Sequence, residues 1–79
     1  MSSKPNALAQ IDTKSLRERV LDTLREAIVT GELKPGQPLH ENDLALQLGV
    51  SRAPLREAFQ ILSREGLVES VPYKGAFVS

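Results

Sequence analysis

Two arginines and a glutamine recur at a spacing that places them on one side of a helix. Arg52, Arg56 and Gln60 stand at i, i+4 and i+8, and helical residues four apart share a face. An arginine can bond the O6 and N7 atoms of guanine together, which is worth about 1–3 kcal/mol of discrimination against a wrong base. Ser51 and Ala53 are small neighbours of these residues. This face is therefore a candidate for reading bases in a DNA groove.

The helix that would carry this face is indicated by apolar residues at i, i+3, i+4 and i+7. They are Leu55, Ala58, Phe59 and Leu62. Ser51 suits the N-cap, Pro54 falls in the first turn, where a missing N–H costs little, and Gly66 marks the end. The pattern predicts a helix over residues 52–65, with the arginines opposite its apolar face.

A shorter helix precedes it. Residues 41–48 carry an apolar stripe at helical spacing, and Gly49 ends the stripe. Residues 49–51 then link the two helices, and two helices joined by a short glycine-containing turn describe a helix-turn-helix. Arg52 and Arg56 could be ordinary solvated charges on an arbitrary helix. Their place at the start of the second helix, which enters the major groove in DNA-binding proteins, favours the DNA contact.

The segments on either side complete a winged helix. Residues 16–30 have apolar residues at four-residue spacing behind a capping-box pattern at 15–18, which predicts a first helix. Residues 67–71 and 76–79 are two apolar segments around the turn 72–75, which predicts a β-hairpin. The expected fold class is mainly α with a small β-hairpin, in a three-helix winged helix-turn-helix.

Two loops join these elements. Residues 32–39 contain proline and glycine turn signals, which predict a loop whose leucines pack onto the core. Residues 72–75 are the candidate wing. Lys74 can meet a phosphate, Tyr73 can donate to phosphate or pack on a sugar, and Gly75 permits close approach of the backbone. The same residues also suit an ordinary hairpin turn, and the two interpretations are nearly compatible.

The other polar residues are predicted to be structural or solvated. His40, before the second helix, is interpreted as a surface or cap residue in preference to a proton switch. Residues 41–43 are interpreted as a solvated face in preference to a cation site. Glu57 is predicted to form an intramolecular pair, with Arg64 or Arg25 as the candidate partner.

The composition argues against several classes of protein. A chain of 79 residues is one domain at most, too short for a two-lobed catalytic fold. Ten Lys and Arg offset ten Asp and Glu, which argues against a polyanion-coating protein with a basic tail. There is no Cys and only one His, so no metal site is expected. No nucleophile stands at a recognisable spacing from a base, so we expect no catalytic residues and no cofactor.

The hydropathy pattern favours the cytoplasm. No apolar run approaches the roughly 20 residues that a membrane-spanning helix needs. The N-terminus has no continuous apolar stretch of about 7 to 15 residues, as a secretory signal would. Residues 1–14 are polar and unpatterned, and we expect a flexible segment there, followed by one domain over residues 15–79.

The segment VSRAPLREA, residues 50–58, resembles the GntR family of bacterial transcription regulators. The resemblance covers residues 16–78 and rests on the order and spacing of several pieces. These are AIVTGELKPG at 27–36, ENDLA at 41–45, LGVSR at 48–52, EGLV at 65–68 and GAFV at 75–78. The form R-x-P-x-R-E-A within the first segment looks most like the subfamily with an all-helical ligand-binding domain, often called FCD.

The resemblance implies specific roles for residues of this chain. The family's recognition-helix arginines, which contact operator guanines or nearby phosphates, fall on Arg52 and Arg56, and the hydroxyl residue before them falls on Ser51. The wing tip, which reaches the minor groove in the family, falls on residues 73–75. A contact from the preceding helix, basic in some members, falls on Asn42, which can hydrogen-bond but cannot form an ionic contact.

The resemblance also implies partners. A member of this family would bind an inverted-repeat operator in double-stranded DNA as a homodimer, and its C-terminal domain would bind an effector metabolite. The sequence stops at Ser79, where the linker to that domain would begin. We therefore expect the effector site and most of the dimer interface to be absent from these residues.

Two other functions remain open. The GntR family includes fusions to an aminotransferase-like domain, so the chain could be the DNA-binding module of such a regulator; the R-x-P-x-R-E-A form favours FCD. A winged helix can also serve as a protein-interaction module. Retained DNA binding after Arg52→Ala and Arg56→Ala would favour that second alternative.

Overall fold

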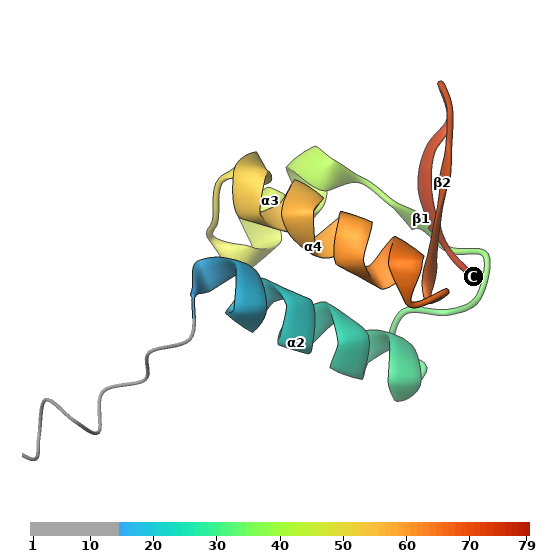
Figure 1. Cartoon of the computed structure of the whole chain (residues 1–79), viewed down its shortest axis with the longest axis horizontal. Helices are drawn as coiled ribbons and strands as arrows, with labels where there is room; N and C mark the ends of the chain where they lie inside the picture. The colour runs from blue at the N-terminus through green and yellow to red at the C-terminus, as the bar shows by residue number, and fades with distance from the viewer. Residues whose placement is uncertain (1–14) are drawn as a thin grey trace, which may run out of the picture.

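A computed structural model describes residues 15–79, and Figure 1 shows their arrangement. The expected flexible segment over residues 1–14 lies outside the described residues. The elements follow the order α2 (Leu16–Val29), β1 (Pro38–Leu39), α3 (Glu41–Leu48), α4 (Arg52–Arg64), β2 (Val68–Val71) and β3 (Gly75–Val78). Over residues 15–79 the chain forms a three-helix winged helix-turn-helix, so the predicted fold class is confirmed.

The first helix begins at a capping box. The backbone N–H of Glu18 donates to the Ser15 hydroxyl at 3.1 Å, and the backbone N–H of Ser15 donates to the Glu18 carboxylate at 2.9 Å. These bonds satisfy two donors that a helix start otherwise leaves unpaired. The helix ends at Val29, one residue before the predicted end, because Thr30 is its C-cap.

The helix-turn-helix is closed by a glycine in the left-handed region. Gly49 has φ +71°, a conformation that residues with a Cβ seldom adopt, and it ends α3. The backbone N–H of Val50 returns to the Ala45 carbonyl at 3.0 Å, which turns the chain sharply. Ser51 is the N-cap residue of α4 as predicted, but its hydroxyl makes no capping hydrogen bond. The helix ends at Arg64, one residue before the predicted end.

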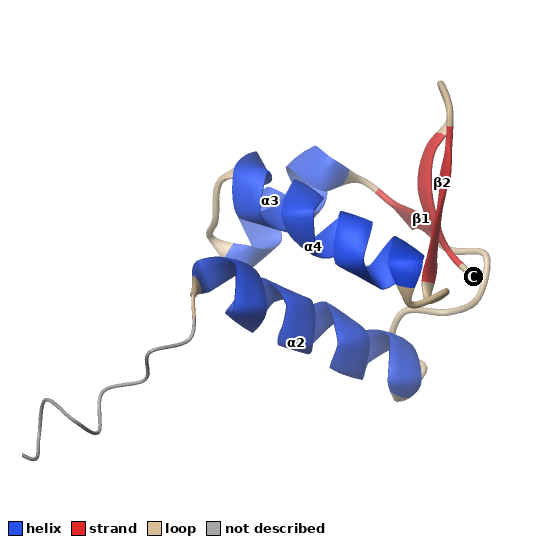
Figure 2. Cartoon of the chain, in the orientation of Figure 1, coloured by secondary structure: helices blue, strands red, loops and turns tan. Residues whose placement is uncertain are grey.

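A three-stranded antiparallel sheet stands at the end of the domain where α2 and α4 finish (Figures 1 and 2). The strand order is β1-β3-β2, with Val71 opposite Gly75 at the tip of the hairpin. The hairpin was predicted, whereas β1 was not. Leu39 does pack in the core as expected, but Pro38 and Leu39 also pair with Phe77 and Ala76. A two-residue strand is too short to show an alternating pattern, and its proline is typical of edge strands.

The core forms mainly between α2 and α4, with the sheet and α3 closing its ends. The predicted apolar face of α4 is buried: Leu55, Ala58 and Leu62 are all 0% exposed. Val20, Leu21 and Leu24 of α2 complete the core's centre. Because packing in the core holds the buried face of α4 in place, the direction in which its exposed side points is also fixed. Among residues 15–79, no helix is long and apolar enough to cross a membrane.

Candidate nucleic-acid interface

A groove of about 870 Å³ lies between the outer face of α4, the start of α3 and the hairpin. It brings together most of the residues predicted to contact DNA. Those lining it are Asn42, Arg52, Arg56, Gln60, Tyr73 and Gly75. Leu39 and Phe59 also line it and belong to the core, so the groove is backed by the packed interior. The predicted residues Ser51, Ala53 and Lys74 are exposed outside this lining.

Arg56 forms an ion pair across the helix-turn-helix. Its Nε donates to Oε1 of Glu41, the first residue of α3, at 2.9 Å. The Arg56 side chain is 56% exposed, whereas that of Glu41 is 30% exposed. Arg56 therefore lines the groove with more than half of its side chain open to solvent, while Glu41 is more covered by the protein. Glu41 is thus half-buried and paired, whereas residues 41–43 were predicted to form a solvated face.

Arg52 makes a looser contact of the same kind. Its Nη1 donates to Oδ1 of Asn42 at 3.4 Å, near the limit for a hydrogen bond. Both side chains are exposed. Arg52 and Arg56 thus each meet a residue in the first turn of α3, one neutral and one acidic. The neutral amide leaves the charge of Arg52 uncompensated by that contact.

The start of α4 presents small and polar groups beside the arginines. Ser51, Ala53 and Gln60 are all exposed. With the buried residues of α4 on the other side, the helix separates cleanly into a packed face and a polar face. The residues therefore lie as the helical spacing predicted.

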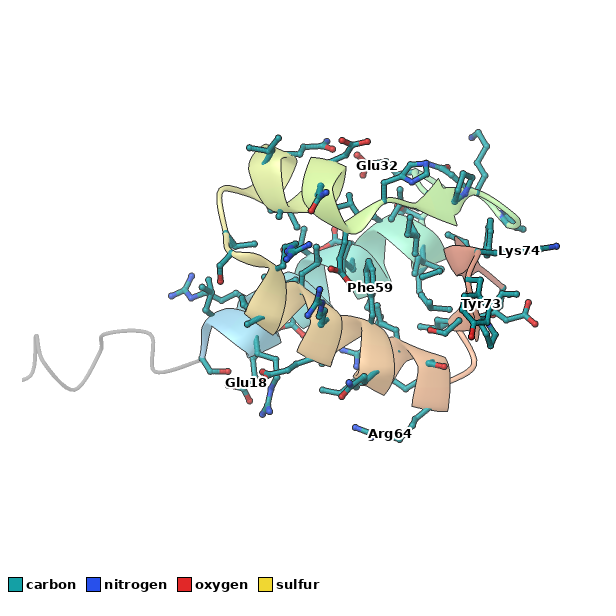
Figure 3. All side chains as sticks on the ribbon, turned by 90° about the horizontal axis from the view of Figure 1, so that it is seen from above. Glu18, Glu32, Phe59, Arg64, Tyr73 and Lys74 are labelled. Carbon is teal, nitrogen blue, oxygen red and sulfur yellow. The ribbon has the colours of Figure 1, made fainter. Side chains whose placement is uncertain are left out.

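The hairpin tip forms a projecting wing. Tyr73 has φ +66° and a fully exposed side chain, at 108% of its reference area. The backbone N–H of Lys74 donates to the Val71 carbonyl at 3.0 Å and closes the turn. Figure 3 shows Lys74 extending away from the domain at the wing, while Arg64 lies far from it at the end of α4. Gly75, predicted as part of the loop, is the first residue of β3.

The groove carries mixed charge. Glu41 and Asp43 line it together with Arg52 and Arg56, and His40 lines it as the exposed N-cap of α3. His40 makes no capping hydrogen bond through its side chain. Within residues 15–79, no group of three or more His, Cys, Asp or Glu residues could hold a metal ion. The charge of the groove therefore comes from both acidic and basic side chains, of which Glu41 and Arg56 form an ion pair.

A second arginine pair lies on the other side of α4. Arg25 donates from Nε to Glu65 Oε1 at 3.0 Å, from Nη2 to Glu65 Oε2 at 2.5 Å and from Nη1 to Asp22 at 3.4 Å. These hydrogen bonds lower the pKa of Glu65 and raise that of Arg25. The predicted pairing of Glu57 is wrong: Arg25 is engaged by other carboxylates, and Glu57 forms no ion pair with another described residue.

Comparison with known proteins places this winged helix-turn-helix in a family. Residues 16–78 match the model of the bacterial regulatory proteins of the gntR family. An uncharacterized HTH-type transcriptional regulator in an unstable DNA locus of Streptomyces ambofaciens is 44% identical over 91% of this chain and 30% of its own length. The chain therefore belongs to the GntR family, and its described residues form a DNA-binding domain of that type.

Solved structures agree with this assignment. A GntR-family transcriptional regulator from Pseudomonas syringae has a TM-score of 0.73 and 37% identity, over 95% of this chain and 29% of that one. The DNA-binding domain of AraR, in complex with its operator ORE1, has a TM-score of 0.77 and 34% identity, over 85% of this chain and 83% of that one. The chain spans about 30% of the length of the curated relatives it matches.

Proposed function

We propose that this chain binds a specific operator in double-stranded DNA, with α4 in the major groove and the wing at residues 72–75 in or near the minor groove. One observation carries the proposal. Arg52, Arg56 and Gln60 all lie on the exposed side of α4, and packing of its buried side in the core turns them toward solvent. The major groove, about 12 Å wide, admits one such helix.

Each residue of this surface has a proposed role. Arg52 and Arg56 bond guanine edges or phosphates, and Gln60 extends the same face. Ser51 donates its hydroxyl to a phosphate, and Ala53 is small enough to allow close approach. Asn42, Tyr73, Lys74 and Gly75 form the flanking contacts to the backbone and the minor groove. The grouping is supported by the groove that joins α3, α4 and the hairpin, which all of these residues line except Ser51, Ala53 and Lys74.

The whole regulator is proposed to act as a homodimer on an inverted repeat in the cytoplasm, without catalytic activity. Its relatives are named as transcriptional regulators and are about three times longer than this chain. An effector metabolite would bind a further domain of the whole regulator. We propose the FCD subfamily for that domain because residues 52–58 read R-x-P-x-R-E-A.

The two alternatives have less support. The relatives from Streptomyces ambofaciens and Pseudomonas syringae are named as transcriptional regulators, and neither name mentions an aminotransferase. The similar AraR domain was solved on an operator, which supports DNA in preference to protein as the partner of this surface.

Selection from a random pool of DNA duplexes by the chain is the direct test. We expect recovery of one half-site motif with a guanine that disappears when Arg52 is replaced by Ala. Arg64→Ala is the matched control, because it removes the same charge from the far end of α4. Equal enrichment by the wild type and by Arg52→Ala would contradict the proposed recognition helix.

A second experiment tests the dimer. The 79-residue chain should be mainly monomeric, because its described surface offers no long apolar seam. Fusion of a foreign dimerisation module after Ser79 should raise affinity for a two-half-site operator by about 10²- to 10⁴-fold through effective concentration. A stable dimer of the unfused chain, already binding as tightly as the fusion, would refute this expectation.

A further inference from the structure

The geometry of the Glu41–Arg56 pair leaves the outer edge of the guanidinium available. The pair uses only Nε of Arg56, at 2.9 Å from Oε1 of Glu41. A guanidinium has five N–H donors, four of them on the two Nη atoms. Those four donors make no hydrogen bond to another described residue, and the Arg56 side chain is 56% exposed where it lines the groove. Arg56 is therefore held at one edge and open at the other.

We propose that Glu41 is a positioning residue that makes Arg56 selective for a base edge over a phosphate. This inference rests on the proposed function of α4 as the DNA-reading helix. The carboxylate holds the guanidinium by Nε, so that the two Nη groups face a base as a fork. Glu41 itself needs no contact with DNA for this role.

The position of Glu41 suits an anchor. Its side chain is 30% exposed, about half the exposure of Arg56, and it lies in the first turn of α3, where the helix dipole favours a carboxylate. The two helices are fixed relative to each other through Ala45 and Leu55, both in the core. A free arginine loses rotamer freedom on binding, and prior ordering reduces that loss. The Glu41 carboxylate therefore favours DNA contacts that Arg56 makes in the one orientation that the ion pair holds.

The charge of Glu41 acts in the same direction. Non-specific affinity for DNA comes almost entirely from cations on phosphates. A phosphate near Arg56 also approaches the Glu41 carboxylate and is repelled by it, whereas the O6 and N7 atoms of guanine carry no net charge. Glu41 thus weakens binding to arbitrary DNA more than binding to the preferred base pair, which is how a repulsive element produces specificity.

The test compares affinity for the duplex selected by the wild type with affinity for a scrambled duplex of the same length and composition. Glu41→Ala should lower the ratio of the two affinities by about two- to fivefold, the range expected for an exposed ion pair. Glu41→Ala and Arg56→Ala should lose sequence preference at the same base pair of the duplex. Glu41→Gln, which keeps the acceptor oxygen but not the charge, should retain part of the preference.

Asp43→Ala is the matched control. It removes the same charge from the same helical turn, and Asp43 forms no ion pair with another described residue. It should raise both affinities together and leave their ratio unchanged. Combining Glu41→Ala with Arg56→Ala should reduce the ratio no further than Arg56→Ala alone, because the two side chains act as a unit.

Three results would overturn the inference. The first is a ratio for Glu41→Ala equal to that of the wild type or of Asp43→Ala. The second is a further loss from Glu41→Ala when Arg56 is already absent. The third is a wild type that does not distinguish the two duplexes, which removes the proposed function as well. Thermal unfolding of each variant checks that it folds. If Glu41→Ala does not fold, the same comparison is made with Glu41→Gln.

Discussion

Similar residues are used differently on the two sides of this domain. On the α2 side, Ser15 is closed into a capping box, and Arg25 engages two carboxylates through three nitrogens. On the groove side, Ser51 stands at a helix start without a capping bond, and Arg56 engages one carboxylate through one nitrogen. The residue types match, but the share of their hydrogen-bonding capacity used inside the protein does not.

The share of a side chain's hydrogen bonds that is made inside the protein distinguishes a structural role from a binding role, whatever the residue type. A side chain that makes most of its hydrogen bonds inside the protein stabilises the fold and has little left for a ligand. A side chain held by one atom is ordered and still has donors for a partner. Side chains on the groove side are thus partly ordered and still have free hydrogen-bond donors, and a DNA-reading surface needs both.

The largest expected effect separates the two arginines. Arg56→Ala should weaken binding to the selected operator by about 1–3 kcal/mol, because it removes a bidentate base contact. Arg25→Ala should leave operator affinity unchanged and lower the unfolding temperature. Fluorescence titration of a labelled duplex and thermal unfolding, run on both variants, measure the two quantities. The same loss of operator affinity in both variants would remove the distinction between the two sides.

The two serines provide the next comparison. Ser15→Ala should lower the free energy of unfolding by about 0.5–2 kcal/mol, because it opens a capping box. Ser51→Ala should change stability much less, since its hydroxyl makes no capping bond, and should weaken operator binding instead. Urea denaturation and DNA titration of the pair test this. A destabilisation by Ser51→Ala as large as that by Ser15→Ala would contradict the comparison.

Much of this arrangement follows from local sequence. The helical period of residues 55–62 predicted both the buried face of α4 and the direction of its arginines, because a straight helix fixes the two together. Ser15 and Glu18 are three residues apart, so their capping box could also be predicted from the sequence. Gly49 and Gly66 both have positive φ and follow the ends of α3 and α4, although α4 ends one residue earlier than predicted.

What sequence could not predict depends on how distant segments meet. Pro38 pairs with Phe77 only because the hairpin folds back beside it, and two residues carry no periodic signal. The Glu41–Arg56 pair depends on the angle between α3 and α4, which the spacing within either helix does not set. The same holds for Arg25, where Glu65 rather than Glu57 reaches the guanidinium because it lies just beyond the end of α4.

Salt dependence tests the groove side as a whole. If the domain makes about four phosphate contacts, log K should fall with log salt at a slope of about −3.6. Lys74→Ala should make this slope shallower by about 0.9, because Lys74 is proposed to meet a phosphate at the wing. Arg64→Ala should leave it unchanged. A slope near zero for the wild type would contradict phosphate contact altogether.

The smallest expected effect concerns the α2 side and pH. Hydrogen bonds from Arg25 lower the pKa of Glu65 in the folded chain. A lowered folded pKa means that the pair contributes stability above the ordinary glutamate value of about 4.3, and that this contribution is lost as the pH falls through the folded value. The wild type should therefore be more stable than Glu65→Gln at neutral pH, and the difference should vanish in acid.

Thermal unfolding of both proteins across the acid range measures that difference. Glu57→Gln is the matched control, since Glu57 is an exposed glutamate of α4 that forms no ion pair with another described residue. Its difference from the wild type should not follow the same pH course. Both Arg25 and Glu65 are partly open to solvent, so screening keeps the effect small, and added salt should reduce it further. A Glu65→Gln difference that stays constant with pH would show that Arg25 and Glu65 do not stabilise the fold as a charged pair. The contrast between the two sides would then rest on the serines and on DNA binding by Arg56.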